Sequence, residues 1–251
     1  MTMALPAPFV LVDLDTVAST NDEAMARAAA GAPAWTVVRA RCQTAGRGRR
    51  GKSFASPEGN SYTSFILRPR GAPGEVAQIA LVAGLATAEA ISAVAPNLPA
   101  ARCKWPNDVL VAGHKVCGIL VEASSSGDRV DHVVVGIGIN LSSHPDLPGL
   151  RIGDLGSLGA SGIGRDIVLA ALAERLHARC EGWQQQGFGA LRQDWLARAA
   201  GLGRTVRIED GARSMAGELV DIDGEGALVL AGPDRTRHRV VSGSLFLEDA
   251  A

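Results

Sequence analysis

Apolar residues recur along the chain with two kinds of spacing, and the pattern changes once, near residue 202. Before that point, short apolar and β-branched runs predict strands, and longer segments with apolar residues at helical spacing predict helices. The predicted strands cover 9–15, 35–41, 61–67, 101–105, 108–113, 115–124 and 130–142, and the predicted helices cover 20–31, 75–94, 165–183 and about 188–199.

Two of the predicted helices carry further signals. The segment 20–31 begins with Thr20 and has Glu23 three residues later, which predicts a capping box, and Gly31 is expected to end the helix. The segment 75–94 is hydrophobic nearly all round, so we expect it to be buried deeply in the core.

From residue 204 onward, short apolar runs are separated by turn signals such as "DGEG" at 223–226, where glycine supplies a positive φ. About 50 residues with this pattern predict a small β domain. We therefore predict two domains, a larger one over residues 1–202 and a smaller one over residues 203–251.

The composition is that of an ordinary globular protein, with 47% hydrophobic and 20% charged residues and a net charge of -1. This balance offers no broad basic face, so we expect neither sequence-specific DNA binding nor membrane association. No apolar run approaches about 18 residues, no secretory signal is present, and too few residues precede the first predicted strand for a helix-turn-helix. The cysteines form no C-x-x-C pair and no zinc spacing, so we expect them to be reduced in the cytoplasm: Cys42, Cys103, Cys117 and Cys180.

The segment "GRGRRGKS", residues 46–53 and here called the basic loop, fits three nucleotide-binding patterns at once. It matches the phosphate loop G-x-x-x-x-G-K-S, and also G-x-G-x-x-G, which marks dinucleotide-binding proteins and the kinase glycine loop. The first two patterns need a helix directly after the loop, but Pro57, Gly59 and Asn60 follow, and then strand formers. A kinase also needs "HRD" and "DFG", and neither tripeptide occurs. The context therefore argues against all three mechanisms.

The basic loop still crowds like charges onto a flexible backbone, because glycines alternate with Arg47, Arg49, Arg50 and Lys52. A solvated basic turn is the ordinary explanation for such a cluster. The glycine spacing and the polar neighbours before the loop favour a function instead. We expect the loop to be mobile when empty and to become ordered around a polyanion, such as a triphosphate together with a carboxylate.

Two other stretches combine polar residues or glycines with predicted strands. "KWPND" at 104–108 is either an ordinary turn or part of a site, and Lys115 on its strand is either a solvated edge residue or a functional cation. Gly136 and Gly138 interrupt the strand "VVVGIGIN", which indicates either a bulge or the close approach of a ligand or another backbone.

Taken in order, these stretches resemble the biotin–protein ligases. The resemblance rests on "STNDEA", "QTAGRGRRGKSFASPEGNSYTS", "KWPNDVLV", "KVCGILVE" and "VGIGIN", and it covers most of residues 19–141. It implies an α/β (α+β) catalytic domain with a mixed, largely antiparallel sheet flanked by helices, followed by a small SH3-like β-barrel. One departure is Phe54, which stands where the family often has tryptophan.

The resemblance also implies the site residues. Biotin binding is expected from Ser19, Thr20, Asn21, Gln43, Gly46, Arg47, Gly48, Arg49, Lys115, Gly118, Gly136 and Gly138. ATP binding is expected from Arg47, Arg49, Arg50, Lys104, Asn107, Asp108, Lys115 and Asn140. Lys115 and Arg49 are the expected catalytic residues, and no residue is assigned as a metal ligand.

The implied reaction joins biotin to AMP at the expense of ATP, with Mg²⁺, and then transfers biotin to a lysine of a biotin carboxyl carrier protein. Fixed cations fit this chemistry, because the carboxylate must attack a phosphate of like charge. Three alternatives stay open: a lipoate–protein ligase of the same fold, a non-catalytic biotin-binding regulator, and a true phosphate-loop hydrolase. The sequence does not decide whether the protein is a monomer or a homodimer.

Overall fold

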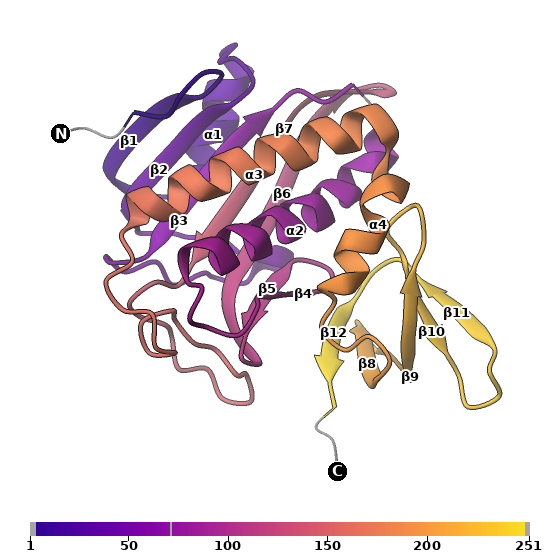
Figure 1. Cartoon of the computed structure of the whole chain (residues 1–251). Helices are drawn as coiled ribbons and strands as arrows, with labels where there is room; N and C mark the ends of the chain where they lie inside the picture. Colours follow the sequence, from indigo (N-terminus) through magenta and orange to yellow (C-terminus); the bar gives the residue numbers. More distant parts are fainter. Residues whose placement is uncertain (1–3, 71, 249–251) are drawn as a thin grey trace.

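The computed structural model describes residues 4–70 and 72–248, and it contains two sheets (Figure 1). The larger sheet has the order β1-β2-β3-β7-β6-β5-β4. Its strands are β1 (Val10–Val17), β2 (Thr36–Gln43), β3 (Ser61–Leu67), β4 (Arg102–Lys104), β5 (Asp108–Val111), β6 (His114–Ser126) and β7 (Arg129–Ile139). Only β1 and β2 run parallel, and the other neighbouring pairs are antiparallel, so the expected mixed, largely antiparallel sheet is confirmed.

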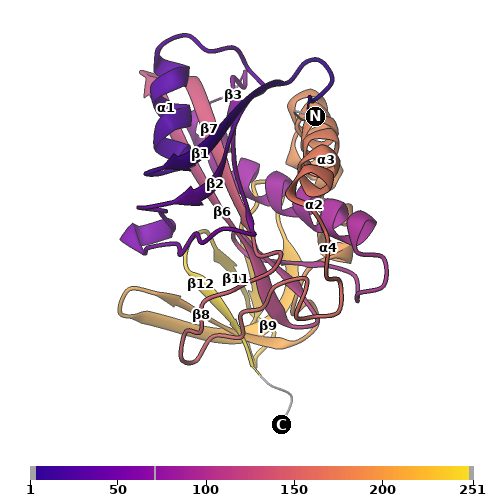
Figure 2. The ribbon, with the colours of Figure 1, turned by 90° about the vertical axis from the view of Figure 1, so that its left-hand side faces the viewer.

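Helices cover both faces of the larger sheet. They are α1 (Thr20–Ala29), α2 (Val76–Val94), α3 (Arg165–Gln186) and α4 (Phe188–Ala197), with short 3-10 turns at Arg49–Gly51 and Pro73–Glu75. Figure 2 shows α1 on one side of the sheet and α2 and α3 on the other. The predicted helices are therefore all present, with ends that shift by a few residues.

Side-chain alternation along β7 assigns its residues to the two faces. Val135 and Ile137 belong to the main core, which α2 and α3 cover, whereas Val134 packs in a small cluster with Ala24 and Ala28 of α1. The glycines of β7 share the even-numbered face with Val134, so they lie on the α1 side of the sheet. That face is where the polar motifs of the sequence gather.

Helix α2 is apolar because it lies in the core of the protein. Of the helices in the described residues, only Pro73–Val94 is long and apolar enough to cross a membrane, and 67% of its most apolar window is buried inside the protein. The expectation of a deeply buried core helix is confirmed, since Ile79, Val82 and Leu85 have no exposed surface.

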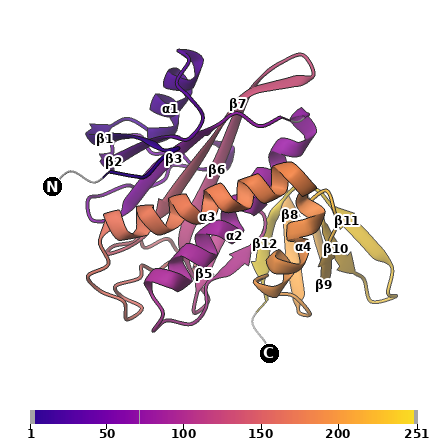
Figure 3. The same ribbon diagram turned by 45° about the horizontal axis from the view of Figure 1, so that its top comes forward.

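The C-terminal residues form an antiparallel sheet with the order β11-β10-β9-β8-β12. Its strands are β8 (Thr205–Asp210), β9 (Arg213–Ile222), β10 (Leu228–Ala231), β11 (Arg237–Val240) and β12 (Ser244–Leu247). Figure 3 shows this sheet beside α4, at the far end of the molecule from α1. Its apolar residues, including Val206 and Leu219, continue the main core, and the domain boundary between residues 202 and 203 stays a prediction.

Candidate functional site

Three strand glycines, here together called the floor, leave part of the α1 side of the sheet without Cβ atoms. Gly118 of β6 pairs directly with Gly138 of β7, and Gly136 is the next residue of β7 on the same face. A Cβ atom on Gly136 would lie 2.1 Å from Asn21 Oδ1, and one on Gly138 would lie 2.6 Å from the Phe54 ring. The strand register is regular at both glycines, so the bulge interpretation is wrong, and the groups that approach them are the side chains of Asn21 and Phe54 rather than another backbone. Approach by a ligand stays a prediction.

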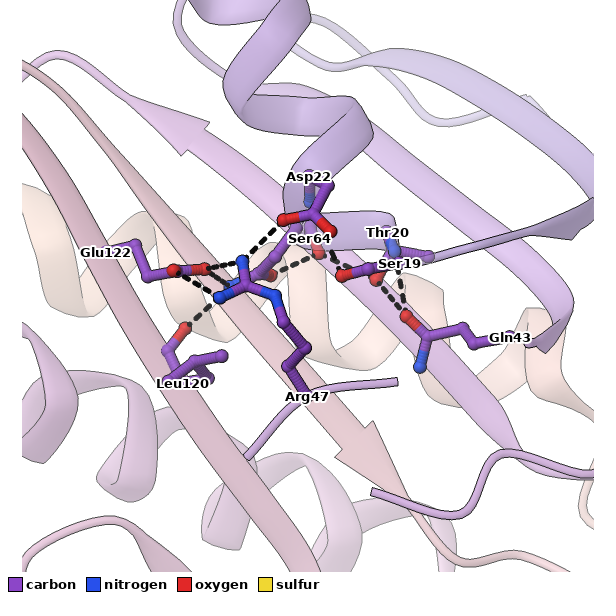
Figure 4. Close-up of polar contacts among 9 residues, drawn as sticks. Ser19, Thr20, Asp22, Gln43, Arg47, Ser64, Leu120 and Glu122 are labelled. Carbon is purple, nitrogen blue, oxygen red and sulfur yellow. Dashed lines mark hydrogen bonds and ion pairs between the residues drawn. The ribbon is translucent and has the colours of Figure 1, made fainter. Parts of the chain in front are cut away.

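One end of this floor is a polar network at the start of α1, here called the α1 end. It is formed by Ser19, Thr20, Asn21 and Ser64, which are buried, and by half-buried Gln43, and Figure 4 labels all of them except Asn21. Gln43 Oε1 accepts hydrogen bonds from the Thr20 backbone N–H (2.8 Å) and from the Thr20 hydroxyl (3.0 Å). Ser64 Oγ donates to Asn21 Oδ1 (2.6 Å) and lies 2.8 Å from Thr20 Oγ1. The side chains of the α1 end therefore hold one another in place.

The N-terminal cap of α1 differs from the sequence prediction. Ser19 is the capping residue, and its hydroxyl accepts a hydrogen bond from the Asp22 backbone N–H (3.4 Å). The predicted capping box of Thr20 with Glu23 is wrong, because the Thr20 hydroxyl is already engaged by Gln43. At the other end of α1, Gly31 follows the C-cap residue Ala30 and has a φ of +93°, which agrees with the prediction that the helix ends there.

The other end of the floor, here called the lysine end, gathers Arg49, Lys104, Asn107, Asp108 and Lys115. Lys115 Nζ lies 2.6 Å from Asp108 Oδ1, and Lys104 Nζ lies 3.6 Å from Asp108 Oδ2. Arg49 comes from the basic loop and donates to Asn107 Oδ1 (3.0 Å). Two lysines therefore share one carboxylate, with the Arg49 guanidinium close by, which leaves the lysine end with an excess of positive charge.

Burial raises the electrostatic cost of this excess charge. It lowers the pKa of Lys104 below its ordinary value, and the neighbouring Lys115 adds to that shift while Asp108 opposes it. Burial also lowers the pKa of Arg49, with a further contribution from Arg50. A bound anion would relieve both costs, because an opposite charge favours the protonated form.

A β-bulge brings Lys115 to the floor. Val109 of β5 pairs with Cys117, but the next residue, Leu110, pairs with Lys115, so β6 carries one extra residue here. Regular alternation would place Lys115 on the face of Cys117, which is buried in the main core. Instead, a Cβ atom on Gly118 would lie 3.5 Å from the Lys115 ammonium.

The basic loop is folded back on itself between the two ends. Gly48 N donates to Lys52 O (2.7 Å), and Phe54 N donates to Gly46 O (2.8 Å). Any side chain at Gly46 would collide with this returning segment, because its Cβ would lie 2.4 Å from Phe54 O. After the loop the chain enters β3 without an intervening helix, which confirms the prediction that it is not a phosphate loop.

The arginines of the basic loop point in three directions. Arg49 reaches the lysine end, whereas Arg47 forms ion pairs with Glu122 (2.7 Å) and Asp22 (2.5 Å) beside the α1 end. Arg50 has a φ of +57° and pairs with Asp210 of the C-terminal sheet (2.6 Å). The three arginines therefore contact different parts of the fold, and their binding of ATP stays a prediction.

Asn140, a predicted nucleotide contact, is buried below the segment that follows β7. Its Nδ2 donates to Gly153 O (3.0 Å), and Gly153 N donates to Lys115 O (3.0 Å). Asn140 thus fixes the backbone next to Lys115, and its contact with a nucleotide stays a prediction. The sequence did not mark Asp22, Ser64, Glu122 and Asp210 as site residues. For Glu122 a signal was available, because it lies four residues after Gly118 on β6 and an even spacing along a strand places both residues on one face.

Comparison with known proteins agrees with this geometry. Residues 16–140 match the biotin/lipoate A/B protein ligase family, and residues 201–247 match the biotin protein ligase C terminal domain. The biotin–[acetyl-CoA-carboxylase] ligase of Paracoccus denitrificans is 41% identical over 222 residues, which cover 86% of this chain and 91% of that protein. The corresponding ligase of Mycobacterium tuberculosis is 35% identical over 231 residues, 89% of this chain and 85% of that protein.

Among solved structures, the biotin protein ligase of Aquifex aeolicus in complex with biotin and ATP superposes with a TM-score of 0.81. It is 27% identical and covers 96% of this chain and 99% of that chain. The chain therefore belongs to the biotin/lipoate A/B protein ligase family. The relatives named above are all biotin ligases.

Proposed function

We propose that the protein is an ATP-dependent biotin–protein ligase, which activates biotin as biotinyl-5'-AMP and transfers it to a lysine of a biotin carboxyl carrier protein. The observation that carries the proposal is the excess positive charge of Arg49, Lys104 and Lys115 beside a floor of glycines. The acid would lie along that floor with its carboxylate directed at Lys115, in the place that the Phe54 ring takes beside Gly118 and Gly138 in this structure.

In the first step, a biotin carboxylate oxygen attacks the α-phosphorus of ATP, and the bond to pyrophosphate breaks. Two unit charges about 4 Å apart repel by roughly 1 kcal/mol in water and roughly 4 kcal/mol at an effective dielectric constant of 20. Lys115 and Arg49 lower this barrier, because their charges are fixed before the reaction and need no reorganisation.

In the second step, the amine of the acceptor lysine attacks the acyl carbon of biotinyl-5'-AMP and AMP leaves. The mixed anhydride must be shielded from water until the acceptor arrives. The basic loop, which spans from the α1 end to the lysine end, provides this cover.

Mg²⁺ would arrive with ATP and neutralise phosphate charge when bound. Asp108 and Asn107 offer side-chain oxygens to such an ion, but in this structure Lys104, Lys115 and Arg49 engage them. The phosphates and waters would therefore supply most of its ligands, as is usual for Mg²⁺. In the part of the chain that the structure describes, no group of three or more His, Cys, Asp or Glu residues could hold a metal ion. The donor set thus fits an ion carried by the nucleotide better than a resident metal.

The experiment is transfer of labelled biotin to a biotin carboxyl carrier domain, with and without ATP, and with lipoate as the competing acid. We expect labelled acceptor only when ATP is present, and no displacement by lipoate. Transfer of lipoate instead would assign the alternative substrate, and ATP hydrolysis without either acid would indicate a hydrolase. A cytoplasmic location and the absence of sequence-specific DNA binding remain predictions.

A further inference from the structure

Two carboxylates that have no assigned role hold the side chain of Arg47. Arg47 Nη1 donates to Glu122 Oε1 (2.8 Å), and Nη2 donates to Glu122 Oε2 (2.7 Å) and to Asp22 Oδ1 (2.5 Å). Figure 4 shows the guanidinium between them, with Asp22 on the first turn of α1 and Glu122 on β6. The contact with Glu122 is bidentate, which is the strongest geometry for an arginine and a carboxylate.

The charge balance of Arg47 is the reverse of that at the lysine end. One guanidinium faces two carboxylates, and its hydrogen bond to Glu122 raises the pKa of Arg47. A phosphate brought to this position would meet negative charge that is already in excess. Arg47 is therefore suited to anchoring the basic loop rather than to binding the triphosphate.

The anchor is connected to the floor of the site. Glu122 Oε2 also accepts a hydrogen bond from Asn21 Nδ2 (2.8 Å), and Asn21 is 4% exposed and lies against Gly136. An exposed ion pair alone contributes little, and Arg47 has a side chain that is 41% exposed. The bidentate geometry and the connection to buried Asn21 distinguish this pair from an ordinary surface contact.

We propose that Asp22 and Glu122 are positioning residues that hold the basic loop closed over the site through Arg47. The proposal rests on the proposed ligase function and assigns the two carboxylates to retention of the acyl-adenylate. When the pair is weakened, the loop opens more often, and biotinyl-5'-AMP escapes before the acceptor reacts. Chemistry at Lys115 is separate, because no contact of Lys115 depends on Arg47.

The test is a double-mutant cycle of Arg47→Gln and Glu122→Gln, read by the release of biotinyl-5'-AMP from the enzyme. Glu122→Gln keeps the shape and one acceptor oxygen of the side chain but removes its charge. We expect each single variant to speed adenylate escape by about tenfold and the double variant to add little more, since both break one interaction. In Glu122→Gln, the KM for biotin should rise, while pyrophosphate release at saturating substrate stays close to that of the wild type.

Asp22→Asn should give a smaller change in the same direction, and Glu23→Gln is the matched control. Glu23 is the neighbouring carboxylate on α1, and it pairs with Arg27 away from the basic loop. Additive effects of Arg47→Gln and Glu122→Gln would overturn the proposal, because they would mean that Arg47 acts on the ligand directly. A wild-type protein that forms no biotinyl-5'-AMP would overturn the proposed function instead, so the two failures are distinguishable.

Discussion

The α1 end and the lysine end of the site differ in how completely their polar and charged groups are paired within the protein. At the α1 end, the polar groups of buried Thr20 and Asn21 and of half-buried Gln43 are satisfied by hydrogen bonds within the protein. At the lysine end, Asp108 pairs with both Lys104 and Lys115 beside the Arg49 guanidinium, so the positive charges outnumber the carboxylate that they share. The first end contributes to folding stability, and the second stores charge for a ligand.

This difference predicts which substitutions should lower folding stability and which should lower the rate of the reaction. Breaking a satisfied buried network costs stability, because the remaining partners stay buried without hydrogen bonds. Removing one of several crowded cations costs no stability and removes chemistry instead. We expect the largest effect from loss of Lys115 and the smallest from titration of Lys104.

Lys115→Ala should lower the rate of pyrophosphate release by about 100- to 1000-fold, the usual cost of removing one fixed donor to a developing negative charge. The thermal midpoint should stay equal to that of the wild type or rise, because like-charge crowding is relieved. Lys52→Ala, which removes an exposed lysine of the basic loop, is the control. Near-normal pyrophosphate release would remove Lys115 from the mechanism. A large loss of stability would contradict the view that the cations of the lysine end do not stabilise the fold.

Gly136→Ala should act in the opposite way. Its new Cβ would lie 2.1 Å from Asn21 Oδ1, so the amide must move and the buried network at the α1 end is disrupted. We expect a loss of about 1–3 kcal/mol in the free energy of unfolding, measured by denaturant titration, together with a raised KM for biotin. Gly189→Ala on α4, where a Cβ meets no atom within 4 Å, should cause neither change. Unaltered stability of Gly136→Ala would show that the α1 end is looser than its hydrogen bonds indicate.

The basic loop connects the two ends, so its protection should depend on the ligand. Arg49 is held only by Asn107 and by nearby charges at the lysine end, and a bound triphosphate would add partners. We expect backbone amides of residues 46–58 to exchange more slowly when biotin and ATP are both present, in hydrogen-exchange measurements on the free and bound protein. Strand β3, whose residues are all buried, serves as the internal reference. Equal exchange in both states would mean that the loop is a static turn.

The smallest expected effect is a pH dependence of ATP binding. Burial lowers the pKa of Lys104 below the ordinary 10.5, so its positive charge is lost at a lower pH than that of an exposed lysine. The KM for ATP should therefore rise by about fivefold between neutral and strongly alkaline pH, in steady-state kinetics. Lys104→Arg should flatten this rise, because a guanidinium does not titrate in that range. An unchanged profile would place Lys104 outside the nucleotide contacts.

The sequence by itself determined the elements and their order. Apolar periodicity predicted the strands and helices, because side-chain spacing reflects which face of an element is buried. The residues after the basic loop excluded a phosphate loop, since Pro57 and Gly59 cannot lie inside a helix that starts there. The glycines of β7 marked a face that something approaches closely, and the resemblance to biotin–protein ligases assigned the motifs to one site.

Only the tertiary structure decided how individual side chains are used. The β-bulge turned Lys115 toward Gly118, and no local pattern announced that bulge. Arg47, Arg49 and Arg50 look equivalent in sequence, yet each pairs with a different part of the fold: Glu122, Asn107 and Asp210. The physical reason is that ion-pair partners are chosen by proximity across long sequence separations, whereas periodicity reports only on the local backbone. Thr20 likewise bonds Gln43 instead of capping its helix, because β2 brings that amide to it from 23 residues away.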